Sequence, residues 1–183
     1  MKDFRSFNIS NETIEALENE NIFEPTPIQE GSIPLFLEGY DLIGQAQTGT
    51  GKTFAYSIPL LERLDKDTKN VEALILCPTR ELSIQVSNEI MKLIQKNKKR
   101  KIATIYGGQS YEKQFKALRL NPQIVIGTPG RIIDMMEKKK LSFANIKTLI
   151  LDEADEMLKM GFQEDLEKIL SEMPKERQTG LFS

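Results

Sequence analysis

The chain has 183 residues, of which 39% are hydrophobic and 28% are charged, and its formal net charge is −2. This composition is typical of one globular domain, and the charge gives no global indication of a nucleic-acid partner. There is no histidine and a single cysteine, Cys77, which excludes Ser-His and Cys-His catalysis and an intrachain disulfide and argues against a zinc site. With no long apolar run and no secretory signal, we expect a cytoplasmic protein that does not enter a membrane.

An N-terminal segment precedes the first predicted strand. Helical patterns at 10–20 and 27–38 flank a turn that contains Pro25 and Pro27. No linker-like composition separates this segment from the rest of the chain. We therefore assign residues 1–40 to the same domain as residues 41–183.

From residue 41 onward, short apolar runs alternate with helical periodicity. The predicted strands are 41–44, 73–77, 101–105, 123–127, 147–151 and 178–182, and the predicted helices between them are 52–64, 79–96, 110–120, 129–139 and 161–173. Continuous apolar strands that alternate with helices indicate a parallel sheet covered on both faces. The sequence predicts a doubly wound α/β fold with a mostly parallel sheet.

The stretch QAQTGTGKT, residues 45–53, lies between a predicted strand and a predicted helix. Gly49 and Gly51 let the backbone approach phosphate oxygens, Lys52 would reach the β- and γ-phosphates, and Thr53 would place its hydroxyl on Mg²⁺. The alternative is a glycine-rich turn that merely precedes a helix, but the strand–loop–helix context favours phosphate binding. The residues assigned to this loop are Ala46, Gln47, Thr48, Gly49, Thr50, Gly51, Lys52 and Thr53, and Ala46 fits at its start if φ is negative.

Two adjacent acids follow the apolar strand in TLILDEADEM. A strand buried on both faces does not easily hold a charge, so we expect Asp152 and Glu153 at its exposed carboxyl end, on the same edge as the phosphate loop. There Asp152 could hold Mg²⁺, directly or through water, while Glu153 orients or deprotonates an attacking water. The alternative is an acidic first turn that caps the next helix, worth about 0.3–1 kcal/mol. The phosphate loop earlier in the chain favours the catalytic interpretation.

The motifs AQTGTGKT and LDEAD occur together with PTPIQ (25–29), PTREL (78–82), GG (107–108) and TPGR (128–131), in this order. In this the chain closely resembles the N-terminal RecA-like domain of the DEAD-box RNA helicases over essentially its whole length. The resemblance implies a P-loop fold that uses ATP and Mg²⁺ for an RNA-dependent ATPase. It also implies that Lys52, Asp152 and Glu153 are the catalytic residues.

The PTPIQ motif then suggests how adenine is recognised. The carboxamide of Gln29 is complementary to adenine N6–H and N7, so Gln29 should select ATP over GTP. The family usually has a glycine and an aromatic residue upstream, whereas this chain has Asn21 and Ile22, with Phe23 one place late. Phe7 resembles the isolated upstream aromatic of this motif, and a core anchor for the helix at 10–20 is an equally good interpretation. The residues assigned to the adenine side are Ile22, Phe23, Pro25 and Gln29.

The PTREL, GG and TPGR motifs also follow predicted strands, so they belong to the same edge of the sheet. By resemblance they bind the backbone of an RNA single strand or short duplex without reading its sequence, and Arg80 and Arg131 can fork onto phosphates. In the structural alternative, Pro78 and Pro129 mark the first residues of helices. The residues assigned to RNA are Pro78, Thr79, Arg80, Gly107, Gly108, Thr128, Pro129, Gly130 and Arg131.

The family's next motif, Ser-Ala-Thr, would begin at Ser183, the last residue of this sequence. We therefore expect a second RecA-like domain that supplies an arginine finger, and the resemblance assigns Asp155 and Ser183 to coupling between the domains. Arginine fingers are worth about 10³–10⁵ in rate, so we expect this monomeric piece to bind nucleotide and to be nearly inactive alone.

The predicted function is ATP-dependent local unwinding of short RNA duplexes. An alternative is an RNA clamp or assembly scaffold in which ATP hydrolysis only determines when the RNA is released. Such a protein would have the same motifs, so the sequence does not separate these two hypotheses. An unrelated ATPase such as a DNA translocase is a third.

Overall fold

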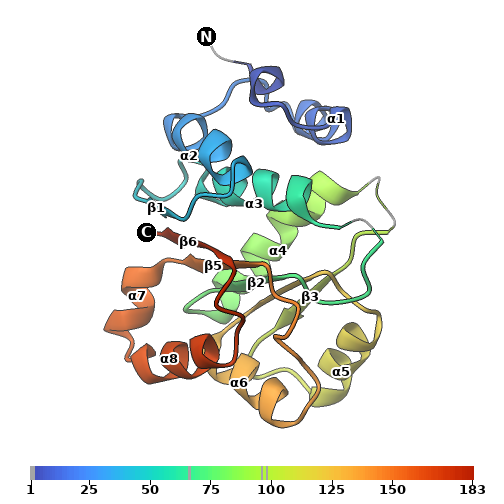
Figure 1. Cartoon of the computed structure of the whole chain (residues 1–183), viewed down its shortest axis with the longest axis vertical. Coiled ribbons are helices and arrows are strands. Elements are labelled where there is room, and N and C mark those ends of the chain that lie inside the picture. Colours follow the sequence, from blue (N-terminus) through green and yellow to red (C-terminus); the bar gives the residue numbers. More distant parts are fainter. Residues whose placement is uncertain (1–2, 66, 96, 98) are drawn as a thin grey trace.

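A single parallel sheet forms the centre of the molecule (Figure 1). The computed structural model describes residues 3–65, 67–95, 97 and 99–183. Within these ranges the sheet has six strands in the order β1-β6-β5-β2-β4-β3, and every neighbouring pair is parallel. The strands are β1 (Leu42–Gly44), β2 (Ala73–Leu76), β3 (Ile102–Ile105), β4 (Ile124–Gly127), β5 (Thr148–Asp152) and β6 (Gln178–Phe182). The predicted α/β fold is confirmed.

The helices agree with the predicted ones to within a few residues at their ends. They are α1 (Asn11–Asn19), α2 (Pro27–Leu37), α3 (Lys52–Arg63), α4 (Arg80–Ile94), α5 (Tyr111–Arg119), α6 (Pro129–Glu137), α7 (Ala154–Lys159) and α8 (Gln163–Ser171), with a 3₁₀ helix η1 (Phe4–Phe7). The short elements η1 and α7 were not among the predicted helices. No helix in the described part of the chain is long and apolar enough to cross a membrane.

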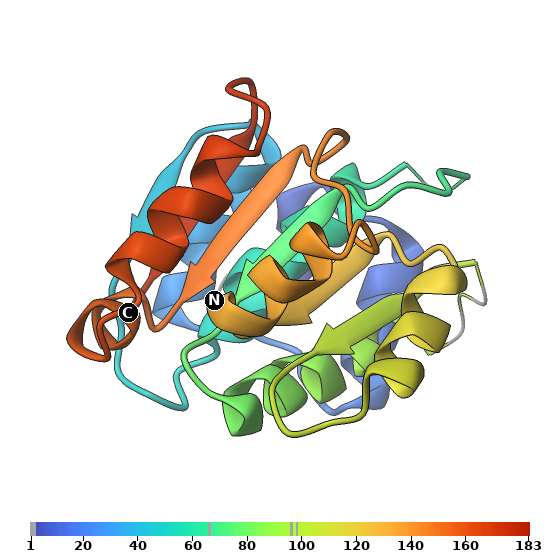
Figure 2. The same ribbon diagram turned by 90° about the horizontal axis from the view of Figure 1, so that it is seen from below.

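Alternate side chains of the central strands point into two separate cores. Ile75 and Ile150 belong to the core that contains the apolar faces of α1, α2, α3 and α4. Leu74 and Leu149 belong to the core that contains residues of α6 and α8. In the view from below, α6 and α8 lie in front of the sheet and the N-terminal helices lie behind it (Figure 2). Burial on both faces explains why these strands read as continuous apolar runs.

The N-terminal segment packs against α3 and shares its core. Phe4 and Phe7 are buried in that core, with their rings edge to face at 6.0 Å between centroids. The Gln178 amide ties the end of α2 to β6 because its Nε2 donates to the carbonyls of Phe36, at 2.8 Å, and Tyr40, at 2.7 Å. These contacts give Phe7 the position of a core anchor.

Candidate functional site

The carboxyl ends of β1 and β5 bring the phosphate loop and the two adjacent acids together. They border a cleft of about 260 Å³ between α3 and α4. The residues that line it are Thr48, Gly49, Gly51, Lys52, Thr53, Phe54, Leu82, Gln85, Glu89, Asp152 and Glu153. Parallel α/β sheets bind ligands at this edge, and the cleft is the candidate nucleotide site.

The glycines of the loop are required by its backbone. Gly49 and Gly51 have φ of 82° and 89°, in the left-handed region that other residues rarely adopt. A Cβ on Gly51 would also lie 2.3 Å from the Gln29 side-chain nitrogen. Ala46 is not among the described residues with positive φ. An alanine at the start of the loop is therefore compatible with this geometry.

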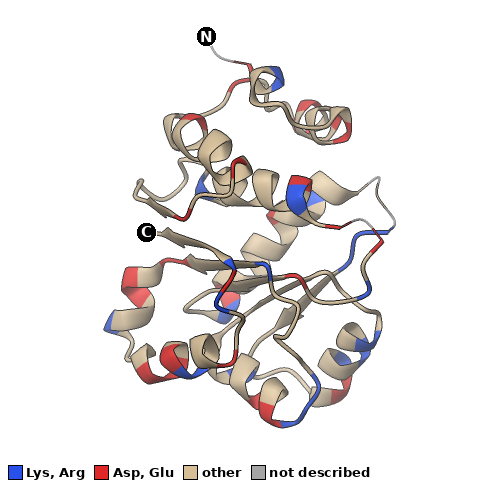
Figure 3. Cartoon of the chain, viewed as in Figure 1, with Lys and Arg blue, Asp and Glu red and all other residues tan. Residues whose placement is uncertain are grey.

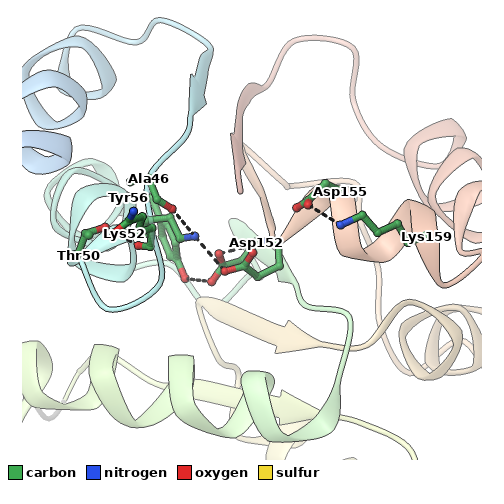
Figure 4. Close-up of polar contacts among 9 residues, drawn as sticks. Ala46, Thr50, Lys52, Tyr56, Asp152, Asp155 and Lys159 are labelled. Carbon is green, nitrogen blue, oxygen red and sulfur yellow. Dashed lines mark hydrogen bonds and ion pairs between the residues drawn. The ribbon is translucent and has the colours of Figure 1, made fainter.

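Lys52 begins α3, and its side chain is buried in the loop. Its Nζ donates to the Ala46 carbonyl at 2.9 Å (Figure 4). The same Nζ lies 3.0 Å from Oε1 of Glu153. The predicted phosphate ligand and the predicted catalytic carboxylate are thus in direct contact. A phosphate that enters this site would compete with the Ala46 and Glu153 oxygens for the ammonium group.

Asp152 does not lie at an exposed strand end, contrary to the expectation from the sequence. It is the last residue of β5 and only 3% exposed. Its Oδ2 accepts a hydrogen bond from the Tyr56 hydroxyl at 2.8 Å, and its Oδ1 accepts one from the Glu153 N–H at 3.1 Å. Burial raises the pKa of Asp152 to about 6, although the Tyr56 hydrogen bond works in the opposite direction. The expectation was wrong because these donors make burial of the carboxyl group possible.

Glu153 has an unusual backbone conformation for its position. Its φ is 52° and its ψ is 51°, and it is the N-cap residue of α7. A non-glycine residue in the left-handed region costs free energy and persists where the surrounding structure holds it. This backbone turn directs the Glu153 side chain toward Lys52, while the helix after it continues away from the cleft.

Gln29 is joined to the phosphate loop. Its side chain is 2% exposed, and its Oε1 accepts from the Thr26 N–H at 3.0 Å. Its Nε2 donates to the Gly51 carbonyl at 3.0 Å. Each polar end of the Gln29 amide therefore makes one hydrogen bond to the protein, and adenine recognition by Gln29 stays a prediction.

A residue with left-handed backbone conformation precedes the PTPIQ motif. Asn21 has φ of 58°, which asparagine tolerates better than most residues and which explains why it can stand where the family usually has glycine. Ile22 packs against the N-terminal core, whereas Phe23 is 58% exposed, and Pro25 lies in the turn just before α2. The exposed Phe23 ring is the available aromatic surface next to the motif.

The last residue of the chain contacts the start of the phosphate loop. The Ser183 N–H donates to the Gly44 carbonyl and the Ala46 N–H donates to the Ser183 carbonyl, both at 3.0 Å. Asp155 lies on α7, where it pairs with Lys159 at 3.1 Å (Figure 4). The predicted coupling roles of Asp155 and Ser183 stay predictions.

The PTREL and TPGR motifs begin helices. Thr79 is the N-cap of α4, with its Oγ1 accepting from the Leu82 N–H at 3.2 Å, and Thr128 is the N-cap of α6. Pro129 is the first residue of α6, but Pro78 precedes the N-cap of α4 and is not a first helical residue. The structural alternative is thus correct for Pro129 and wrong for Pro78.

The GG motif lies between two arginine–tyrosine contacts. Gly107 and Gly108 follow β3, and Gly108 has φ of 80°. The Arg80 guanidinium lies over the Tyr106 ring, 5.1 Å from its centroid. Arg80 is exposed, and it has no ion pair among the described residues. It is the candidate phosphate contact whose charge remains available.

Arg131, in contrast, is held inside the protein. Its side chain is 13% exposed, its Nη1 donates to the Gln109 carbonyl at 3.1 Å, and its Nε lies 3.6 Å from an Asp134 oxygen. The guanidinium stacks on the Tyr111 ring at 4.5 Å, and the Tyr111 hydroxyl donates to Asp134. Arg131 therefore connects the loop after the GG motif to α6, next to the N–H groups of Gly130 and its neighbours at the start of that helix.

The comparison with known families matches residues 26–183 to the DEAD/DEAH box helicases. The chain belongs to the DEAD/DEAH box helicase family. Its curated relatives include ATP-dependent RNA helicases named CshA. The one from Listeria monocytogenes is 51% identical over an alignment that covers 100% of this chain and 35% of the relative. The one from Bacillus subtilis is 49% identical over an alignment that covers 98% of this chain and 36% of the relative. The chain spans about a third of the length of these relatives.

A solved structure shows the same fold. The crystal structure of a DEAD box protein from the hyperthermophile Methanococcus jannaschii superposes with a TM-score of 0.93 and 48% sequence identity, over 99% of this chain and 49% of that chain. This likeness confirms that the DEAD-box chain described here has the RecA-like fold that its motifs predicted.

Sequence reasoning missed the tyrosines of this DEAD-box domain. Tyr56 follows Lys52 by four residues on α3, so the i,i+4 spacing could have placed it on the same helix face as Lys52. Tyr106 and Tyr111 flank the GG motif, and their rings contact the guanidinium groups of Arg80 and Arg131. Their part depends on contacts between distant segments, which the local pattern does not contain.

Proposed function

We propose that this chain is the ATP- and RNA-binding N-terminal domain of an ATP-dependent RNA helicase that locally unwinds short RNA duplexes. The observation that carries the proposal is that Lys52, Glu153 and the buried Asp152 meet at the start of α3. This meeting point lies on the sheet edge where PTREL, GG and TPGR also lie. The proposal is also supported by the curated relatives, which are ATP-dependent RNA helicases.

In this proposal the loop from Ala46 to Thr53 binds the phosphates of the nucleotide. The left-handed Gly49 and Gly51 leave backbone N–H groups free of side-chain shielding, and the N-terminus of α3 adds its positive end. Lys52 would leave the Ala46 carbonyl for the β- and γ-phosphates. Glu153, released from the ion pair, would orient or deprotonate the attacking water.

The donors in the cleft fit Mg²⁺. Among the described residues, no three His, Cys, Asp or Glu side chains gather to form a metal site by themselves. Mg²⁺ is commonly held by one or two protein oxygens plus substrate phosphates, and the Thr53 hydroxyl and the Asp152 carboxylate supply such oxygens beside the loop. When bound there, the metal would neutralise phosphate charge.

RNA would lie across the motifs at the starts of α4 and α6 and at the GG loop. Arg80 offers an exposed guanidinium that has no ion-pair partner among the residues described, and the N–H groups at the start of α6 form a helix N-terminus that suits a phosphate. Acidic residues are prominent along α7 and α8 (Figure 3), so we expect the RNA backbone to avoid that side. A second RecA-like domain would complete both sites. The 183-residue chain by itself is proposed to be monomeric, and its place of action is proposed to be the cytoplasm.

The nucleotide part is tested by competition on this 183-residue chain. A fluorescent ADP is bound in the presence of Mg²⁺ and displaced by unlabelled ADP or GDP. We expect ADP to displace the probe far better than GDP. No binding of the probe would contradict the assignment of the loop, and equal displacement would contradict the role of Gln29.

The helicase part requires the protein that includes the second domain. Strand-displacement assays on a short RNA duplex are expected to show ATP-dependent separation, and Glu153→Gln is expected to retain ATP and RNA binding while losing turnover. RNA binding without strand separation would support a clamp instead. Equal competition by DNA of matched sequence would contradict an RNA reader, because recognition of the 2′-hydroxyl requires RNA.

A further inference from the structure

Tyr56 is a buried tyrosine whose hydroxyl lies on the nucleotide side of the sheet. It stands one turn after Lys52 on α3 and is fully buried. Its ring packs against Phe182, with 5.1 Å between centroids and 57° between planes. Its hydroxyl donates to Oδ2 of Asp152 at 2.8 Å (Figure 4). The ring is therefore fixed by β6, and the hydroxyl is directed at β5.

The Asp152 carboxylate is held at both of its oxygens. The Tyr56 hydroxyl binds Oδ2, and the Glu153 N–H binds Oδ1 at 3.1 Å. Two donors from different elements restrict rotation of the carboxylate about its terminal bond. Because Asp152 also lines the cleft with Lys52 and Thr53, this restriction sets the direction in which its remaining lone pairs face the phosphate loop.

A tyrosine at this position needs a reason beyond packing. A phenylalanine would fill the same space beside Phe182 without bringing a hydroxyl into the core, where a polar group without a partner is costly. The Tyr56 hydroxyl has such a partner, because it donates to Oδ2 of Asp152.

We propose that Tyr56 is a positioning residue for the nucleotide-bound Mg²⁺, because its hydroxyl holds the Asp152 carboxylate in the orientation in which it meets the metal or a metal-bound water. This inference rests on the proposed function. Groups that orient a metal ligand typically contribute about 10-fold to 100-fold in metal affinity. Tyr56 would act through Asp152 and would not touch the nucleotide.

The test measures the binding of a fluorescent ADP to this chain, first in EDTA and then at increasing Mg²⁺. In Tyr56→Phe we expect the Mg²⁺ concentration that gives half of the gain in ADP affinity to rise about tenfold. The affinity in EDTA is expected to stay as in the wild type. Tyr40→Phe, which removes a hydroxyl from an exposed tyrosine, is the matched control and is expected to leave both quantities unchanged.

A second variant tests whether Tyr56 acts through Asp152. Asp152→Asn is expected to lose most of the Mg²⁺ gain, and adding Tyr56→Phe to it is expected to change nothing further, because the two residues form one unit. A further loss in the double variant would overturn the inference. So would full retention of the Mg²⁺ gain in Asp152→Asn, since Tyr56 would then have no metal ligand to position.

Other results of these measurements would also decide whether Tyr56 positions Asp152. An unchanged Mg²⁺ midpoint in Tyr56→Phe, or an equal loss of ADP affinity with and without Mg²⁺, would overturn the inference and leave Tyr56 as a packing residue. Failure of Tyr56→Phe to fold, seen by thermal unfolding, would do the same by showing that the hydroxyl serves the fold. If the wild type binds no ADP, or if Mg²⁺ does not raise its ADP affinity, the proposed function is contradicted. That result comes from the wild type alone, so it is distinguishable from a failure of the inference about Tyr56.

Discussion

The ammonium group of Lys52 lies 3.0 Å from a carboxylate oxygen of Glu153, so the proposed phosphate ligand and the proposed catalytic base neutralise each other in this structure. The Ala46 carbonyl completes the arrangement. Lys52 is thereby already placed inside the loop before a phosphate arrives, and its positive charge is compensated while it is buried. Binding of nucleotide would exchange the carboxylate for phosphate oxygens and free Glu153.

This exchange predicts an effect of Glu153→Gln on binding. The neutral amide competes less strongly for Lys52, and because such partly exposed ion pairs are worth up to about 1 kcal/mol, ADP affinity should rise by up to about fivefold. Titration of this chain with fluorescent ADP measures it. Glu156→Gln, which removes an ion-paired acid from the exposed face of α7, is the control. Weaker ADP binding in Glu153→Gln would contradict the competition.

Gln29→Ala should lower both stability and base selectivity. The substitution leaves the Thr26 N–H and the Gly51 carbonyl without their partner, so the free energy of unfolding should fall by about 1–3 kcal/mol. ADP should also lose its advantage over GDP. Urea unfolding without nucleotide and the displacement assay with the two diphosphates measure the two effects.

A matched control for Gln29 exists on another part of the sheet. Gln123 is also buried, and its side chain makes three hydrogen bonds to the backbone, with Lys101, Thr68 and Lys99. Gln123→Ala should destabilise the fold to a similar degree and leave the preference for ADP intact. Loss of the preference in both variants would mean that general destabilisation, and not Gln29, is responsible.

The raised pKa of Asp152 predicts how stability depends on pH in the absence of metal. With a folded pKa of about 6 and an ordinary value of 3.8, the folded chain keeps this proton at pH values where the unfolded chain has lost it. The contribution of Asp152 to stability therefore falls as pH rises from about 4 to about 6, by about 3 kcal/mol in total. Above that range the loss is complete.

Asp152→Asn isolates this contribution from the other carboxyl groups. In EDTA, the free energy of unfolding of the wild type minus that of the variant should decrease as pH rises from about 4 to about 7. Urea unfolding at several pH values measures the difference. A difference that is constant across the range would show that the pKa of Asp152 is not raised in the folded chain.

The two arginines of the RNA motifs should differ in the salt dependence of RNA binding. Arg80 has no ion pair within the part of the chain that the structure describes. In the protein with both domains, Arg80→Gln should therefore reduce the slope of log affinity against log salt by about 0.7, the value for one phosphate of a single strand. Arg131 is paired with Asp134, so Arg131→Gln should weaken binding with a smaller change in slope. Equal changes would mean that Arg131 also contacts a phosphate.

The sequence predicted the elements well, because their signals are local. Short continuous apolar runs such as the one before Asp152 are typical of strands covered on both faces, and the glycines between Gly49 and Lys52 indicate a loop with left-handed backbone. The order of the strands is not local, since it depends on which apolar faces meet. The six residues of α7 were missed because one and a half turns contain too little periodicity to recognise.

Within the site, residue types were predicted better than environments. The charge pattern gave no sign that Asp152 is buried, because the donor that makes this possible, Tyr56, is almost a hundred residues away in the chain. The same holds for Arg131, whose internal contacts come from the loop after the GG motif and from its own helix. Local motifs indicate candidate residues for the site, and tertiary packing decides how exposed those residues are.

The phosphate-loop strand β1 is at the edge of the sheet and has β6 as its neighbour there. During synthesis on the ribosome, β1 emerges early, whereas residues 178–182 emerge after all the other strands. The loop that carries Lys52 therefore stays without its sheet partner for most of the time in which the domain is made. Pairing over such a long separation is slow to form, so we expect nucleotide binding to be among the last properties that the newly made domain acquires.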